Sequence, residues 1–291
     1  METPHVFGTL NNLVGIMYSP ESVNGTVHPR LAVIMLTPGM LHSAGPFRLH
    51  VDLARELGQY EIPSFRFDLS GIGESLAVGS QGDSIQRAID EVRQAMDLMQ
   101  RETGIDRFVL FGLCSGADDS LYVTGADERV VGMISLDGLG YRTYQYYAHR
   151  LIDNLLPKML SYRWWLNRID RLRRRSKQTP ATLVGGDDIR EFPDRDTAAV
   201  MLRRLVDRGT KLLLIYTGGA SAYYNYENQF ADMFPTLSAS AQSSVKWLPN
   251  ADHAALLCED RAAIVGMCTN WVREQNFAEP AVCAPEPASC A

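Results

Sequence analysis

The sequence places the thiol of Cys114 between two glycines, in the segment Gly112-Leu113-Cys114-Ser115-Gly116. The apolar run 108–111 before it predicts a buried strand, and a helix-compatible stretch follows it. Because glycine has no Cβ, strand and helix can approach closely across the strained turn between them. A thiolate at such a turn would attack carbonyl carbons, and the backbone N–H of Ser115 would stabilise the resulting oxyanion. The alternative is a buried structural cysteine in a glycine-rich turn.

His253 is the candidate base that would activate this thiol. It follows the apolar run 245–248, the last strand that the sequence predicts, and the chain contains only 6 histidines. A neutral imidazole beside a thiol accepts its proton and forms a thiolate–imidazolium pair, which is a strong nucleophile near neutral pH.

The acid that would orient this imidazole is less clearly marked. Asp137 ends the predicted strand 130–136 and is the favoured candidate. Asn225 and Glu227, in the segment after the next predicted strand, are the alternatives. Asp137 could equally be a turn residue before Gly138.

The elements that must position these residues follow from alternating apolar and amphipathic segments. A hairpin is predicted at the N-terminus, and fully apolar runs typical of parallel strands buried on both faces follow it. Their alternation with helices predicts an α/β protein with a mostly parallel, doubly wound sheet. The predicted strands are 6–10, 13–18, 31–36, 63–68, 108–111, 130–136, 211–216 and 245–248, and the main predicted helices are 49–57, 85–99 and 261–274.

Two motifs resemble those of α/β-hydrolases. The Gly112–Gly116 segment is similar to their nucleophile elbow, and Asp68-Leu69-Ser70-Gly71-Ile72-Gly73-Glu74-Ser75 resembles a turn found in many of them. The order nucleophile, acid, histidine is also the same. The resemblance implies the α/β-hydrolase fold, in which the loop after strand 31–36 supplies a second oxyanion N–H, here assigned to Met40. A simple strand-ending turn at Pro38-Gly39 is the alternative.

Within this fold, the chain resembles the hydrolases that accompany exosortase gene clusters. This resemblance implies a cysteine nucleophile but names no substrate. It implies substrate-contacting roles for His42 and Arg48, and Asn225 lies in another matching stretch and is expected to contact substrate too. Arg48 could bind a carboxylate or phosphate, or form a structural ion pair at a helix start. The matching stretches are 41–48, 66–75, 112–117, 136–143 and 216–226.

The chain is expected to consist of a hydrolase core, residues 1–143 and 178–277, with a helical lid inserted at 144–177. The lid segment mixes aromatic residues with arginines, and its aromatic side chains would line an acyl pocket or pack the insert onto the core. Its basic cluster between Arg163 and Lys177 would dock an acidic carrier protein or a CoA-linked substrate, or form a solvated helix face. The Pro- and Ala-rich tail 278–291 is expected to be disordered.

Composition limits the function classes further. The 291 residues are 46% hydrophobic and 21% charged, which is typical of globular proteins, and the net charge of -6 argues against nucleic-acid binding. No apolar run approaches the roughly 20 residues of a membrane span, and no signal peptide begins the chain. The 5 cysteines show no disulfide or metal spacing. We therefore expect a cytoplasmic protein with reduced thiols, no metal and no cofactor.

These observations predict an acyl-transfer enzyme. Cys114 would take an acyl group from a small ester or thioester and pass it to water, as a hydrolase or thioesterase, or to an amine or alcohol, as an acyltransferase. The acyl-cysteine is itself a thioester, which is a modest indication of transfer. The competing interpretation is a non-catalytic binding or scaffold protein of the same fold. Such a protein would be expected to lack the nucleophile or the histidine, and both are present.

Overall fold

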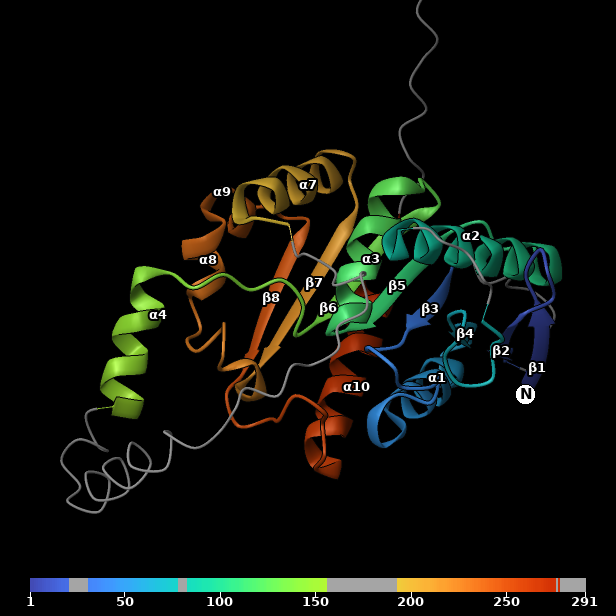
Figure 1. The fold of residues 1–291 in the computed structure, drawn as a ribbon, viewed down its shortest axis with the longest axis horizontal. Helices are drawn as coiled ribbons and strands as arrows, with labels where there is room; N and C mark the ends of the chain where they lie inside the picture. The colour runs from blue at the N-terminus through green and yellow to red at the C-terminus, as the bar shows by residue number, and fades with distance from the viewer. Residues whose placement is uncertain (21–30, 78–82, 156–192, 276, 278–291) are drawn as a thin grey trace, which may run out of the picture.

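The computed structural model describes residues 1–20, 31–77, 83–155, 193–275 and 277. Their centre is an eight-stranded sheet with the order β1-β2-β4-β3-β5-β6-β7-β8 (Figure 1). β2 pairs antiparallel with β1 and with β4, and all other pairs are parallel. The predicted parallel, doubly wound sheet is thus confirmed. The strands are β1 (Glu2–Phe7), β2 (Leu13–Tyr18), β3 (Ala32–Leu36), β4 (Ser64–Asp68), β5 (Phe108–Leu113), β6 (Val130–Leu136), β7 (Lys211–Thr217) and β8 (Ser243–Leu248).

Helices cover both faces of this sheet. Strand side chains alternate between the faces, so that Ile34 and Leu36 pack toward α2 while Val33 and Met35 pack toward α1 and α10. α3 and α7 lie on the same side as α2 (Figure 1). The helices are α1 (Leu49–Gln59), α2 (Ser84–Thr103), α3 (Ser115–Ala126), α4 (Tyr144–His149), α7 (Arg195–Asp207), α8 (Gln229–Met233), α9 (Pro235–Ser238) and α10 (Cys258–Glu274).

The first strand lies earlier in the chain than the sequence predicts. The apolar residues of segment 6–10 suggested a strand there, but Leu10 lies in the turn and is exposed. The strand ends before Gly8, whose φ of +89° starts the turn into β2. Val6 faces solvent on this edge strand, so a hydrophobic residue at this position does not indicate a buried one.

Only the beginning of the predicted lid belongs to the described residues. α4 starts at Tyr144, and one turn of π-helix follows over Arg150–Leu155. A hydrogen bond connects α4 to the loop after β7: the Tyr146 hydroxyl donates to the carbonyl of Ala222 at 2.8 Å. The remainder of the lid segment, with its basic cluster, and the tail 278–291 lie outside the described residues.

Candidate active site

Cys114 occupies the turn between β5 and α3. Its backbone is strained for a residue with a side chain, with φ of 54° and ψ of -121°. A Cβ at Gly112 would lie 2.1 Å from the carbonyl oxygen of Gly116, and a Cβ at Gly116 would lie 2.6 Å from that of Leu36. Both glycines are therefore required by close backbone packing. The turn holds the thiol at the carboxyl end of the central strand, only partly buried.

Asp137 and His253 meet at the same edge of the sheet. Asp137 follows β6 and is 1% exposed, and its carboxylate Oδ2 lies 2.9 Å from Nδ1 of His253, in the loop after β8. Thr217, the last residue of β7, donates its backbone N–H to Oδ1 and its hydroxyl to Oδ2, both at 2.6 Å. The carboxylate is thus held by hydrogen bonds on both oxygens, which orients the imidazole that it contacts.

Hydrogen bonding controls the charge of His253. Hydrogen bonds to the carboxylate of Asp137 and to Cys114 raise the pKa of His253 from 6.5 to about 10, although partial burial acts in the opposite direction. The imidazolium form is therefore favoured at neutral pH. An imidazolium beside a thiol stabilises the thiolate, which is the nucleophilic form of cysteine.

Backbone N–H groups lie next to the nucleophile. Ser115 is the first residue of α3, so its N–H has no acceptor within the helix. Met40 lies in a turn after β3 that is closed by a hydrogen bond from the N–H of Leu41 to the carbonyl of Pro38, 3.1 Å long. The Gly39 N–H donates to the hydroxyl oxygen of Ser115 at 2.6 Å. The structure thus brings together the two segments that the sequence predicts to carry the oxyanion donors.

A cavity of about 270 Å³ opens beside Cys114. Its aromatic wall is formed by Tyr141 and Tyr223, whose hydroxyls donate to the carbonyls of Pro193, at 2.6 Å, and Asp137, at 2.7 Å. Burial raises the pKa of both phenols, so both remain neutral donors. The lining residues are Cys114, Asp118, Asp137, Gly138, Leu139, Gly140, Tyr141 and Tyr223.

Three residues predicted to contact substrate lie outside this lining. The side-chain amide of Asn225 donates to the carbonyl of Tyr146 at 3.1 Å, which connects the loop after β7 to α4. His42 accepts a hydrogen bond from the N–H of Ala44 at its Nδ1. Arg48 precedes α1 with a left-handed φ of 68°. Nδ1 of His253 is bonded to Asp137, rather than to Asn225 or the other alternative, Glu227.

Sequence reasoning missed two side chains that support the site. Thr217 holds the carboxylate of Asp137 by hydrogen bonds. Tyr223 lines the cavity, and its ring packs so closely against Gly140 that a Cβ on this glycine would lie 2.2 Å from the ring. Thr217 could have been found from its position, because it ends the strand parallel to β6, next to the end that carries Asp137. No local pattern marks Tyr223.

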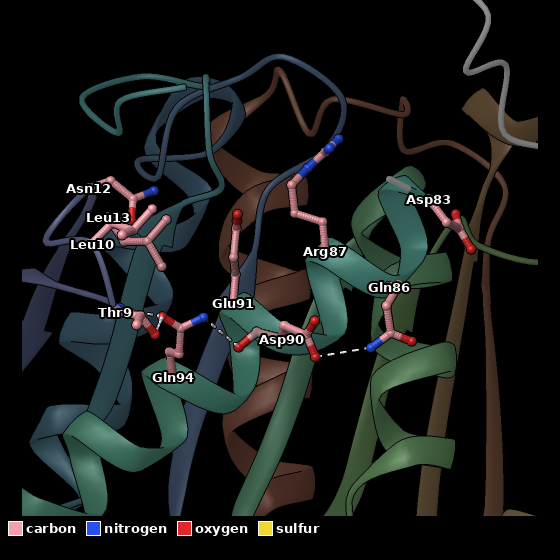
Figure 2. Close-up of a pocket in the computed structure, with 10 residues that line it drawn as sticks. All are labelled: Thr9, Leu10, Asn12, Leu13, Asp83, Gln86, Arg87, Asp90, Glu91 and Gln94. Carbon is pink, nitrogen blue, oxygen red and sulfur yellow. Dashed lines mark hydrogen bonds between the residues drawn. The ribbon is translucent and has the colours of Figure 1, made fainter. Parts of the chain in front are cut away.

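A second pocket, of about 300 Å³, lies between the β1–β2 turn and α2 (Figure 2). It shares no residue with the Cys114 cavity. Gln94 accepts hydrogen bonds from the backbone N–H and the hydroxyl of Thr9, and Gln86 donates to Asp90. Glu91 accepts from the N–H and the hydroxyl of Ser70. These polar side chains thus already stabilise the turn and the helix. Within the described part of the chain, no three His, Cys, Asp or Glu side chains are arranged to hold a metal ion.

The fold is that of α/β hydrolases, as similarity to solved structures shows. An α/β serine hydrolase without a lid from Xanthomonas campestris is 16% identical with a TM-score of 0.54, and 94% of each chain is covered. The esterase domain of a Rhodothermus marinus protein is 15% identical with a TM-score of 0.55, covering 94% of this chain and 98% of its own. The proline iminopeptidase of Mycobacterium smegmatis is 12% identical with a TM-score of 0.52, with coverages of 94% and 98%.

No family model matches the sequence, and no curated protein is significantly similar to it. The structural similarity therefore establishes the fold and leaves the reaction to be argued from the site. Among the described helices, none combines the length and the hydrophobicity needed to cross a membrane.

Proposed function

We propose that this protein is an acyl-transfer enzyme with Cys114 as nucleophile, His253 as general base and Asp137 as the residue that orients the base. The observation that carries the proposal is the contact of 2.9 Å between the buried carboxylate of Asp137 and Nδ1 of His253, at the cavity that Asp137 and the Cys114 thiol both line. The stretches that resemble the exosortase-associated hydrolases contain both Cys114 and Asp137, which supports a cysteine nucleophile. A thiol nucleophile also needs a reducing compartment, which supports a cytoplasmic location.

The chemistry proceeds in two steps. The proton of the thiol resides on Nε2 of His253, and the sulfur of the resulting Cys114 thiolate forms a bond to the carbonyl carbon of an ester or thioester. The oxyanion accepts hydrogen bonds from the N–H groups of Ser115 and Met40. Collapse of the intermediate breaks the bond to the leaving alcohol or thiol, which takes the proton from His253. Water, an amine or an alcohol, deprotonated by His253, then attacks the acyl-cysteine and releases the thiol.

The cavity beside Cys114 indicates the size and character of the acyl group. Its volume of about 270 Å³ and its lining by Leu139, Tyr141 and Tyr223 suit a short or medium acyl chain of low polarity. Two carboxylates, Asp118 and Asp137, also line it, and among the described residues no arginine or lysine does. We therefore propose a small acyl ester, or an acyl thioester with the acyl group carried by CoA or a carrier protein. Binding of an anionic acyl group through Arg48 is not supported by this lining.

The first experiment measures the mass of the intact protein after mixing with p-nitrophenyl acetate, p-nitrophenyl hexanoate or hexanoyl-CoA. We expect wild type to gain one acyl group and Cys114→Ala to gain none. An adduct that persists in Cys114→Ala would move the chemistry away from this residue. Absence of an adduct with every acyl donor would favour the non-catalytic interpretation.

The variant His253→Gln tests whether the thiol must be activated by the histidine, because the thiol itself is retained. This variant keeps Cys114, and we expect acylation by the same esters to slow by a factor of about 10² to 10⁴, the usual contribution of general base catalysis. Addition of amines or alcohols to acylated wild type then distinguishes transfer from hydrolysis, because transfer produces an amide or ester detectable by mass.

A further inference from the structure

We propose that the side chain of Ser115 is a positioning residue for the oxyanion site: its hydroxyl oxygen holds the Pro38–Gly39 peptide, one peptide before the Met40 N–H, against the elbow. This inference rests on the proposed function. The observation is the hydrogen bond from the Gly39 N–H to the Ser115 hydroxyl oxygen, 2.6 Å long, between residues 76 positions apart. It connects the two segments whose N–H groups are needed for one oxyanion.

Apart from the hydrogen bond from the N–H of Leu41 to the carbonyl of Pro38, which closes the turn after β3 on itself, few contacts with other described residues hold this turn. Gly39 has a φ of +54°, and a Cβ built there would meet nothing within 4 Å. The neighbouring Met40 side chain is 92% exposed. Within the described part of the chain, the turn therefore has little side-chain packing, and its place relative to α3 is set by the close approach of Gly116 to Leu36 and by the hydroxyl of Ser115.

The same hydrogen bond argues against Ser115 as an alternative nucleophile. Its oxygen already accepts a hydrogen bond from the Gly39 N–H, whereas Cys114 is the group that interacts with His253 and raises the pKa of its imidazole. A serine that accepts from a backbone N–H is suited to orient a peptide. Loss of this hydrogen bond would displace the oxyanion donor, and a displaced oxyanion donor costs more in rate than in substrate binding.

The test compares two reactions of the same thiol. Acylation by p-nitrophenyl butyrate passes through an oxyanion, whereas alkylation by iodoacetamide is a displacement at carbon that forms none. We expect Ser115→Ala to lower the rate constant of acylation about tenfold, to change KM less than twofold, and to leave the alkylation rate within twofold of wild type. Ser115→Thr retains a hydroxyl and is expected to recover most of the acylation rate.

Ser120→Ala is the matched control. The hydroxyl of Ser120 donates to the carbonyl of Gly116 at 2.7 Å within α3, so its removal also deletes a serine hydrogen bond near the elbow. We expect it to leave the acylation rate unchanged. Equal losses of acylation and alkylation in Ser115→Ala would overturn the positioning role, because they would report damage to the thiol itself.

The outcomes separate this inference from the proposed function. If wild type is acylated and Ser115→Ala is acylated at the same rate, the positioning role is wrong while the cysteine mechanism stands. If wild type is alkylated by iodoacetamide but acylated by no ester or thioester, the proposed function is wrong, and the role of Ser115 is rejected with it.

Discussion

The carboxylate of Asp137 connects the carboxyl ends of three neighbouring strands of the parallel sheet. It follows β6, accepts two hydrogen bonds from Thr217 at the end of β7, and contacts His253 after β8. A buried carboxylate needs such partners, because an unpaired charge in the core is costly. The same hydrogen bonds that satisfy Asp137 also hold it in the orientation that His253 requires.

Asp137→Asn is expected to change both the rate and its pH dependence. The side-chain amide can still accept from Thr217, but it removes the negative charge that, together with Cys114, raises the pKa of His253 to about 10. Without that charge the pKa of the imidazolium moves down toward 6.5, so the alkaline limb of kcat/KM should move from near pH 10 toward neutral pH. We expect kcat/KM at pH 8 to fall at least a hundredfold. Steady-state rates from pH 5 to 11 measure both effects.

Asp252→Asn provides the control for this experiment. Asp252 is adjacent to His253 in sequence, but its carboxylate accepts hydrogen bonds from the N–H groups of Ala254 and Leu256, both 2.8 Å long. Its replacement should leave the alkaline limb in place. An alkaline limb that stays near pH 10 in Asp137→Asn would contradict the role assigned to Asp137.

His50 is expected to control stability rather than activity. It is fully buried in α1 with its ring edge-on to Phe111, and burial lowers its pKa to about 4. Above pH 6.5 the residue is neutral in both the folded and the unfolded chain. Below pH 6.5 only the unfolded chain binds the proton, so the free energy of unfolding should decrease by about 1.4 kcal/mol per pH unit until about pH 4.

Urea unfolding of wild type and His50→Leu between pH 4 and 8 measures this contribution. The difference in unfolding free energy between the two proteins should be constant above pH 7 and should change steadily below pH 6.5, to the disadvantage of wild type. A difference that stays constant across the whole range would show that His50 does not titrate in this way.

Among the structural elements, the β5–α3 elbow restricts most strongly which residue types can occupy its positions. Gly112→Ala would place a methyl group 2.1 Å from the backbone oxygen of Gly116. The strand and the helix would have to move apart to remove this steric clash. We expect a loss of at least about 1–3 kcal/mol in unfolding free energy, and a shift of several degrees in Tm. Thermal unfolding followed by circular dichroism measures it.

Gly125 lies in α3, the helix that follows the elbow, and its substitution is expected to have the opposite effect. A Cβ there meets nothing within 4 Å, and alanine is favoured over glycine in helices by up to about 1 kcal/mol. Gly125→Ala should therefore raise Tm slightly. If both substitutions lowered Tm alike, the loss at Gly112 would reflect a general intolerance of alanine for glycine in this region and not the close approach at the elbow.

At the scale of the whole molecule, Arg261 connects the histidine loop to the helices on one face of the sheet. From α10 it donates to the carbonyl of Ala255 at 3.0 Å and to the carboxylate of Asp52 in α1 at 3.1 Å. The ion pair is partly exposed and screened, so it contributes little. The hydrogen bond to the carbonyl oxygen is better protected, since Arg261 is largely buried.

Arg261→Met is therefore expected to cost about 1–2 kcal/mol in unfolding free energy, because the carbonyl of Ala255 loses its partner. Asp52→Asn should cost less than about 1 kcal/mol. Chemical denaturation of both variants measures the two costs. Equal losses would mean that the ion pair, and not the hydrogen bond to the loop, dominates.

The fold was largely predictable from sequence because its signals are local. The apolar runs of β3, β5, β6 and β7 are buried on both faces, so each appears as an uninterrupted stretch. The edge strand β1 was misplaced for the converse reason. Phe7 alone among its residues is buried, and its boundary is set by the positive φ of Gly8 and not by hydrophobicity.

The sequence by itself determined the order of strands and helices and the position of Cys114 between two glycines, since both follow from residue types within short windows. Only the tertiary structure decided that His253 bonds Asp137 rather than Asn225 or Glu227. The two residues are 116 positions apart, and their contact depends on how the ends of β6 and β8 are placed by the sheet between them. The hydrogen bond from Gly39 to Ser115 was decided in the same way, because such contacts form between strand ends that no local pattern relates.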